Sequence, residues 1–423
     1  MNSGIVAIII VVIVIGLYIS NLLPYAVTAL LACVAMVVFQ VVPFSTAFAG
    51  FGSDTVMLVA GMMVMGHALF ETGAARLLGK MLTRFCGKSE RLFLAICLIF
   101  TTILTAFCSN TATIMLMMAV VSAAARVNPK ITKKNCVMAL GFAAVSGGSL
   151  TMVGSTPQLA VQGILESSGI RTIGLFDMVA AGLPRMIMLI IYFTTIGYQL
   201  QKKVFRFDEI VDESESGENS ETEYPPKWKA FLALGILADC IASFVLQKLS
   251  VGTTSLIGAL LCILTGCISW KRTIKVLDWS SLVLVGSAIG FATGLDKSGG
   301  GAMIAGFIVN LLGDHISFIV LLAVFLMLST VLANIMSHTA TCSILVPIAV
   351  ALTAQLGYDS TLIAIAIIQG AAMASVTPVS TAPITMTMRA GYRFSDYVKV
   401  GGLMNVISYI ITIGSLFIMA RVV

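Results

Sequence analysis

Charged residues are scarce in this sequence. Asp, Glu, Lys and Arg make up only 10% of its 423 residues, whereas a soluble domain has about 25%. Hydrophobic residues make up 58%, and the mean hydropathy is +1.03. A chain with so little charge has too few polar groups to cover a globular surface in water. The composition therefore excludes a soluble enzyme with a single anchor and indicates a polytopic protein in a lipid bilayer.

Other absences exclude particular chemistries. The nine cysteines form no CxxC pair, so we expect neither a metal cluster nor a disulfide framework. Three histidines without an HExxH motif argue against an intramembrane protease, and the lack of a Walker A motif excludes ATP as the direct energy source in this polypeptide. The net charge of +6 does not indicate a nucleic-acid partner, because the basic residues sort by membrane side. We expect no cofactor and no catalytic residue.

Apolar segments long enough to cross a bilayer recur throughout the chain. The first, over residues 5–18, has neither a basic start nor a cleavage site of small residues, so we interpret it as a retained span rather than a signal peptide. The segments fall at about 4–20, 23–42, 54–72, 135–168 (broken), 176–200, 229–247, 252–270, 280–296, 359–390 (broken) and 400–421.

Two short polar islands interrupt the apolar sequence and nearly repeat each other. One runs from Cys108 to Thr113 (CSNTAT) and the other from Met336 to Thr341 (MSHTAT). About 45 residues after each island comes a second break, Gly154 to Pro157 (GSTP) and Ser380 to Pro383 (STAP). Polar, proline-containing backbone persists at membrane depth only where it is buried in protein or lines a water-filled cavity. Four such breaks in paired positions predict the binding site of a transporter.

Basic residues decide how the island segments enter the membrane. The apolar arms around the first island, 92–107 and 111–125, are flanked on both sides by Lys and Arg, which concentrate on the cytoplasmic side. Both flanks then lie on one side, so we predict a re-entrant hairpin over residues 92–125. The flanks of the second island are poor in bases, and we predict a second hairpin over 316–355 that enters from outside. The bases that flank the first hairpin are Arg76, Lys80, Arg84, Lys88, Arg91, Arg126, Lys130, Lys133 and Lys134.

An acidic segment divides the chain into halves of similar length. Residues 206–227 contain eight acidic residues together with serines and a glycine, and such a segment cannot bury a core. We interpret it as a solvated cytoplasmic linker between a first repeat, residues 1–205, and a second repeat, residues 228–423.

The sequences of the two halves align at their polar breaks, so the match does not rest only on apolar residues that any two membrane segments share. Ser109 aligns with Ser337, 228 residues later, and Pro157 aligns with Pro383, 226 residues later. Five crossings and one hairpin in each half turn the second copy upside down, which gives an inverted-topology repeat. The predicted fold is an all-α polytopic membrane protein with two inverted repeats, each of about five transmembrane helices plus one re-entrant helical hairpin, and with two broken helices.

Each island combines groups that bind cations with groups that bind anions. Ser, Asn and Thr are favoured helix N-caps, and the free amides at the start of a helix attract an anion. The last carbonyls of the preceding helix, with Ser and Asn side-chain oxygens, are hard ligands that suit Na⁺. At the second breaks Gly154 permits unwound backbone whose carbonyl can complete a cation shell. The hydroxyls of Thr156 and Thr381 are placed to face a carboxylate.

With these hairpin tips, later breaks and inverted halves, the chain resembles the divalent anion:Na⁺ symporter family over essentially its whole length. Members of this family carry dicarboxylates, citrate or sulfate. The resemblance implies a Na⁺-coupled symporter of a small anion in the plasma membrane. It also implies a homodimer, in which a hairpin-bearing domain moves in an elevator-like manner against a scaffold formed largely by the first spans of each half.

The resemblance also assigns residues. It places the first Na⁺ site on Thr105, Ser109, Asn110 and Gly154, and a second Na⁺ site on Ala333, His338 and Ser380. The chain departs from the family pattern at the second site, where the family has an Asn in place of His338 and a hydroxyl in place of Ala333. The implied substrate-binding residues are Ser109, Asn110, Thr111, Thr156, Pro157, Ser337, His338, Thr339, Thr381 and Pro383.

Several ionisable groups at membrane depth remain open to two interpretations. His338 is either a proton-coupling group or anion donor, or a neutral structural residue at a hairpin tip. We expect Glu71 and Asp296 to be solvated near span ends, and Asp239 and Arg185 to pair or to reach the interface. His67 and His315 follow no pattern.

The sequence leaves other transport functions open. An H⁺-coupled anion carrier, a cation/proton antiporter and an oxyanion exporter share these features, and broken helices alone do not exclude a channel.

Overall fold

The computed structural model describes residues 2–20, 22–74, 89–205, 226–246, 249–312, 317–378 and 380–422. Every regular element in these ranges is a helix, which confirms the all-α prediction. Six described helices are long and apolar enough to cross a membrane, or seven if one bent pair forms a single span. Six further apolar helices are shorter. Three of them, Asn110–Arg126, Phe318–Ala333 and Ser360–Ala372, belong to the predicted hairpins and a predicted broken span. Tyr25–Val38 and Val251–Leu264 are instead shorter than the crossings predicted at 23–42 and 252–270.

The helices of the first half follow the predicted segments closely. The segment predicted at 176–200 differs, because it forms two helices that meet at Thr195 with a bend of 50°. The elements are α1 (Ser3–Ser20), α2 (Tyr25–Val38), α3 (Phe44–Ala47), η1 (Ala49–Gly52), α4 (Asp54–Glu71), α6 (Glu90–Thr105), α7 (Asn110–Val127), α8 (Lys133–Gly148), α9 (Thr156–Ser167), α10 (Val179–Thr194) and α11 (Ile196–Val204).

The second half contains two helices that the sequence analysis did not predict, α14 and α16. α16 begins directly after Gly299, which has a φ of +76°. A run of glycines in the sequence is typical of a turn, and Gly299 does adopt a turn conformation. The elements are α12 (Lys227–Leu246), α13 (Val251–Leu264), α14 (Trp270–Val276), α15 (Trp279–Lys297), α16 (Gly300–Leu312), α17 (Phe318–Ala333), α18 (His338–Leu356), α19 (Ser360–Ala372), α20 (Ala382–Thr387), η3 (Met388–Ala390) and α21 (Phe394–Val422).

The two halves contact each other and themselves in matching ways. α2 of the first half packs on α15 of the second, and α4 packs on α13. Within the halves, α6 and α7 pack on α8 just as α17 and α18 pack on α19. These matched contacts are those of two copies of one unit. Most of the acidic segment 206–227 lies outside the described residues, so the linker and the boundaries beside it stay predictions.

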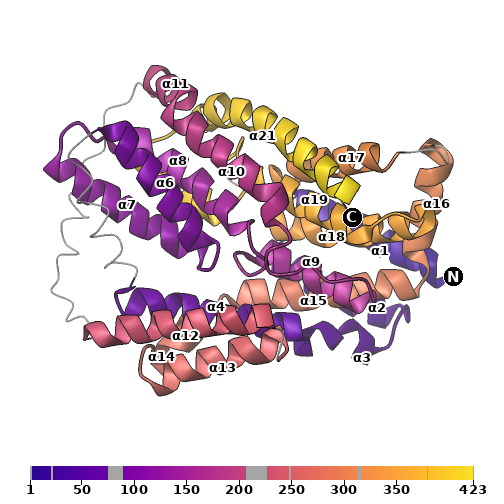
Figure 1. Cartoon of the computed structure of the whole chain (residues 1–423). Coiled ribbons are helices and arrows are strands. Elements are labelled where there is room, and N and C mark those ends of the chain that lie inside the picture. Colours follow the sequence, from indigo (N-terminus) through magenta and orange to yellow (C-terminus); the bar gives the residue numbers. More distant parts are fainter. Residues whose placement is uncertain are drawn as a thin grey trace.

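The helices gather into two layers with the hairpins in one of them. Figure 1 shows α4, α12, α13 and α14 on one side of the molecule and α6, α7, α8, α10 and α11 on the other, with α9 between them. The outer ends of α6 and α7 lie at the left of this view, and the start of α17 lies at the right. The two hairpins therefore enter from opposite ends, as the inverted repeat predicts.

A buried carboxylate anchors the outer end of the first hairpin. Glu90 is 7% exposed and accepts hydrogen bonds from the Thr132 backbone N (2.8 Å) and hydroxyl (2.6 Å), from Asn135 Nδ2 (3.2 Å) and from the Tyr198 hydroxyl. The donors come from the start of α8 and from α11. The first turn of α6 is thereby attached to two other elements.

Replacing Glu90 with Ala is expected to destabilise the protein by about 3 kcal/mol, because several buried donors lose their acceptor together. The measurement is thermal unfolding of the purified protein in detergent. Glu71→Ala is the control, since its ion pair with Arg272 (2.5 Å) is solvent-exposed and contributes at most about 1 kcal/mol. Equal melting temperatures for Glu90→Ala and Glu71→Ala would contradict the assignment.

Candidate functional site

The two polar islands form the tips of the hairpins and start new helices. Ser109 is the N-cap of α7, and its Oγ accepts from the Ala112 N–H at 3.4 Å. Ser337 is the N-cap of α18, and its Oγ accepts from the Ala340 N–H at 3.2 Å. The prediction that the island serines cap helices is therefore confirmed. Amides in the first turn of each helix remain available to an anion.

The second breaks also end at helix N-termini. α9 begins after Ser155 and α20 begins after Thr381, with Pro157 and Pro383 in their first turns. Proline is tolerated there because the first-turn N–H groups have no partner within the helix. Each proline thus starts a new helix after the break.

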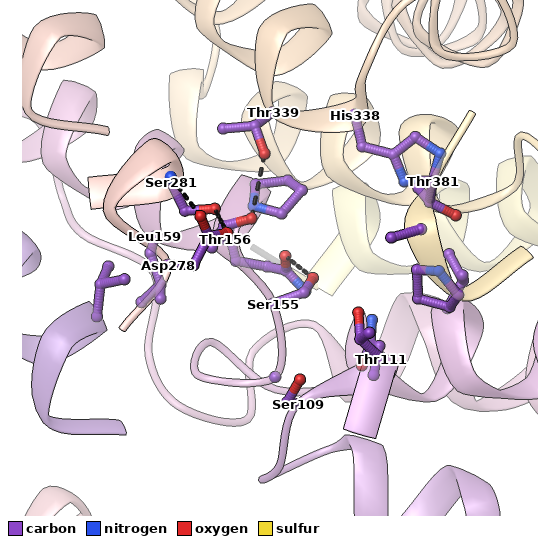
Figure 2. Close-up of a pocket in the computed structure, with 18 of the residues that line it drawn as sticks. Ser109, Thr111, Ser155, Thr156, Leu159, Asp278, Ser281, His338, Thr339 and Thr381 are labelled. Carbon is purple, nitrogen blue, oxygen red and sulfur yellow. Dashed lines mark hydrogen bonds between the residues drawn. The ribbon is translucent and has the colours of Figure 1, made fainter. Parts of the chain in front are cut away.

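All four breaks line one cavity of about 640 Å³. Figure 2 shows Ser109 and Thr111 on one side of it, with Thr156, His338, Thr339 and Thr381 around it. The Thr156 and Thr339 hydroxyls lie 3.2 Å apart and join the two halves across this region. The predicted site residues that line the cavity are Ser109, Asn110, Thr111, Gly154, Thr156, Pro157, Ser337, His338, Thr339, Ser380, Thr381 and Pro383.

Two residues assigned to cation sites do not line the cavity. Thr105 and Ala333 are the last residues of α6 and α17, and both are fully buried. The Thr105 hydroxyl donates to the Thr101 carbonyl at 2.8 Å. Thr105 lies against Gly147, since a Cβ on that glycine would sit 2.5 Å from its Oγ1. Thr105 is thus close to the break but behind the cavity wall.

An acceptor without a donor distinguishes the first half. Asn110 Oδ1 is buried and has no hydrogen-bond partner among the described residues. The Asn110 carboxamide faces Gly148 at the end of α8, where a Cβ would lie 2.6 Å from Oδ1. Gly154 in turn lies against the Gly148 carbonyl. The Gly148 carbonyl accepts from Gln158 Nε2 at 2.6 Å, so Asn110 Oδ1 is the oxygen left unsatisfied beside this break, which suits a hard cation such as Na⁺.

Two side-chain oxygens near the tip and the later break of the second half are already hydrogen-bonded. The Ser380 hydroxyl donates to the Ala374 carbonyl (3.1 Å) and is also 3.2 Å from the Thr377 carbonyl. Asn334 Oδ1 accepts from the backbone N–H groups of Val376 (3.1 Å) and Thr377 (3.2 Å). Ala333 supplies no hydroxyl. The residues assigned to the second Na⁺ site therefore offer a cation no unsatisfied side-chain oxygen.

Two residues of the second half that line the cavity, His338 and Thr381, have buried polar side-chain atoms without a partner among the described residues. His338 is 6% exposed and its Nε2 has no partner among the described residues, and the Thr381 hydroxyl likewise has none. Figure 2 shows both side chains on the same side of the cavity. A hydroxyl and a ring nitrogen that carries its proton are both hydrogen-bond donors, so this region suits an oxyanion.

Further residues that the sequence analysis did not assign to the site also line the cavity. Among them are Tyr25 of α2, His67 of α4 and Asp278, the N-cap of α15. The Asp278 carboxylate accepts from the Ser281 N–H at 3.2 Å, and His67 Nδ1 lies 2.9 Å from the Met63 carbonyl. An Asp three residues before Ser281 at the start of an apolar run is a capping signal, but nothing in the sequence places Asp278 beside the islands.

The membrane-depth charges differ from expectation at one residue. Arg185 neither pairs with Asp239 nor reaches an interface, because its side chain is 1% exposed while Asp239 is exposed on α12. Glu71 forms an ion pair with Arg272 at the end of α4, and Asp296 is exposed. His315 lies outside the described residues.

Comparisons with known proteins match the chain to a transporter family. A family model described as "Citrate transporter" matches residues 6–369. The sequence is 28% identical to an uncharacterized transporter of Haemophilus influenzae over 95% of this chain and 89% of that protein. It is 23% identical to the sodium-dependent dicarboxylate transporter SdcS of Staphylococcus saprophyticus over 94% of this chain and 82% of that protein.

Two solved structures share the fold. The YdaH transporter of Alcanivorax borkumensis superposes with a TM-score of 0.64 at 12% identity, covering 93% of this chain and 98% of that one. MtrF of Neisseria gonorrhoeae superposes with a TM-score of 0.61 at 16% identity, covering 89% and 83%.

Proposed function

Since this chain belongs to the citrate transporter family, and is a multi-pass membrane transporter rather than an enzyme, we propose that it is a symporter that moves a small anion together with Na⁺. The anion is a di- or tricarboxylate or sulfate. The sodium-dependent dicarboxylate transporter among its relatives supports this choice, as does the resemblance to the divalent anion:Na⁺ symporters.

The observation that carries the proposal is the pairing of two kinds of group at one cavity. Four helix N-termini, at Ser109, Ser155, Ser337 and Thr381, supply amides and positive dipole ends for an anion. The unsatisfied oxygen of Asn110 supplies a cation ligand beside them. Neighbouring sites for opposite charges let each ion stabilise the binding of the other, which is the physical basis of coupled transport.

The transport cycle proposed here is elevator-like. The layer that contains α6–α8 and α17–α19 carries the site, and the layer that contains α4 and α12–α14 is the scaffold. We place the protein in the plasma membrane as a homodimer through the scaffold, with the linker 206–227 in the cytoplasm. Motion of one layer past the other exposes the cavity to each side in turn.

Uptake into proteoliposomes tests the function. Labelled succinate, citrate and sulfate are offered separately, each with an imposed Na⁺ gradient, an imposed H⁺ gradient or neither. The proposal requires saturable uptake of at least one anion that an inward Na⁺ gradient accelerates. Saturable uptake driven only by the H⁺ gradient would replace Na⁺ with H⁺, and no uptake of any anion would reject the function.

His338 favours H⁺ coupling as the second candidate, because it is the one described histidine at a hairpin tip.

If His338 donates a hydrogen bond to the anion instead, the His338→Ala variant raises the KM for the anion about tenfold, which corresponds to about 1.4 kcal/mol, and leaves the Na⁺ dependence unchanged. The measurement is initial uptake rate against substrate concentration at several pH values. His338→Asn is the partner variant, since a carboxamide keeps a donor. If both variants lose the uptake that an imposed H⁺ gradient drives, proton coupling is assigned to the imidazole of His338.

A further inference from the structure

Arg185 is a buried cation without an anionic partner. It lies on α10 and is 1% exposed. Its Nη2 donates to Ser149 Oγ at 2.5 Å, its Nη1 donates to the Gln369 carbonyl at 3.3 Å, and its Nε has no partner. Within the described part of the chain no carboxylate forms an ion pair with it. A buried charge is normally paired, because an unpaired one is costly.

The guanidinium lies directly behind the cavity wall. Ser149 follows the last residue of α8. Gln369 lies on α19 between Ile368 and Ala371, and both of these residues line the cavity. No Lys or Arg is among the described residues that line the cavity, and the formally charged residue there is Asp278. Arg185 is therefore a buried positive charge behind the wall of a chamber whose formally charged lining residue is an aspartate.

The second half bonds the serine that corresponds to Ser149 to a neutral side chain. Ser375 corresponds to Ser149 at the same offset of 226 that aligns the prolines. Its hydroxyl donates to Asn405 Oδ1 at 2.5 Å, and Asn405 lies on α21. Ser149 Oγ instead accepts from the charged Arg185 guanidinium. A serine at this break is therefore satisfied by a neutral partner in one half, so its hydrogen bonding does not require a charge.

We propose that Arg185 is a specificity-determining residue, whose field makes the cavity prefer anions with more than one negative charge. The anion in the cavity is the counter-charge that the arginine lacks. This inference rests on the proposed function, because it needs an anionic substrate. The attraction to a fixed charge is proportional to the charge of the substrate, so removal of the arginine weakens binding in proportion to that charge.

The test compares substrates that differ in charge. Arg185→Gln is assayed in proteoliposomes with citrate, with succinate and with monomethyl succinate, the last as a competitor of labelled succinate. The expected rise in KM or inhibition constant is about tenfold per negative charge, hence about tenfold for the monoester and about a hundredfold for succinate, with a still larger factor for citrate. Arg185→Lys keeps the charge and is expected to keep the wild-type order of affinities.

Two variants of Ser149 separate charge from packing. Ser149→Ala removes a hydrogen bond but no charge, so any loss is expected to be equal for the three compounds. Ser149→Asp places a carboxylate beside the guanidinium and is expected to reproduce the charge-dependent loss with Arg185 in place, which keeps the test valid if Arg185→Gln does not fold. Equal losses for all three compounds in Arg185→Gln and Ser149→Asp would overturn the inference. Wild-type protein that transports none of the anions would instead overturn the proposed function.

Discussion

Asn110→Leu is expected to abolish the Na⁺ stimulation of anion uptake, with a loss of at least about a hundredfold in initial rate at low Na⁺ concentration. Asn110 Oδ1 is a buried acceptor with no donor, and leucine keeps the size of the side chain while it removes that oxygen. A hundredfold change corresponds to about 3 kcal/mol, which is the cost of losing a ligand to a charged group. The measurement is the dependence of uptake on Na⁺ concentration in proteoliposomes.

Asn110→Asp is the matched control for this experiment. The carboxylate keeps an acceptor oxygen at the same place and adds a negative charge, so half-saturation is expected at an equal or lower Na⁺ concentration than in the wild type. If the Asn110→Leu protein remains folded in detergent and its uptake keeps the wild-type dependence on Na⁺ concentration, then Asn110 is not part of the cation site.

The second large effect is expected from Gly154→Ala, with a loss of about a hundredfold in uptake. A Cβ on Gly154 would collide with the carbonyl and Cα of Gly148. The atoms in the way belong to the backbone of Gly148, which cannot move aside as a flexible side chain does. The break would widen and its oxygens would leave the positions that bind the ion, and a displacement of about 1 Å is enough for such a loss.

Gly52→Ala is the control, because a Cβ on Gly52 meets nothing within 4 Å. It is expected to leave uptake near the wild-type rate. Initial uptake rates and thermal unfolding in detergent are measured for both variants. Wild-type uptake by Gly154→Ala would show that the close approach of Gly154 to Gly148 is not part of the site.

Local patterns in the sequence were enough to predict much of the fold. The islands at Ser109 and Ser337 carry residues that favour N-caps, and both serines cap helices in the structure. Pro157 and Pro383 each fall in the first turn of a helix after a break. Such features depend on neighbours within a few residues, so a sequence read alone reveals them. The unpredicted helix α16 begins after glycines, which locally resemble a turn.

The site was predictable only in part. Symmetry between the halves correctly brought the two tips and the two later breaks to one cavity. The resemblance to the symporter family assigned Thr105 and Ala333 to the cation sites, and these residues end their helices behind the cavity wall. Whether a side chain one turn before a tip reaches the cavity depends on the rotation of the helix in its packing, which the spacing of residues does not set.

The sequence by itself determined the membrane class, the helical fold, the paired breaks and the residue types at each tip, because composition and helix-capping chemistry are local properties. Only the tertiary structure decided which of these polar atoms remain unsatisfied. Asn110 Oδ1 is free whereas Asn334 Oδ1 is bonded. Arg185 lies behind the cavity wall, and Asp278 comes to line it. Each of these outcomes depends on contacts between helices far apart in the chain, and hydrogen bonding and burial are settled only when those helices pack.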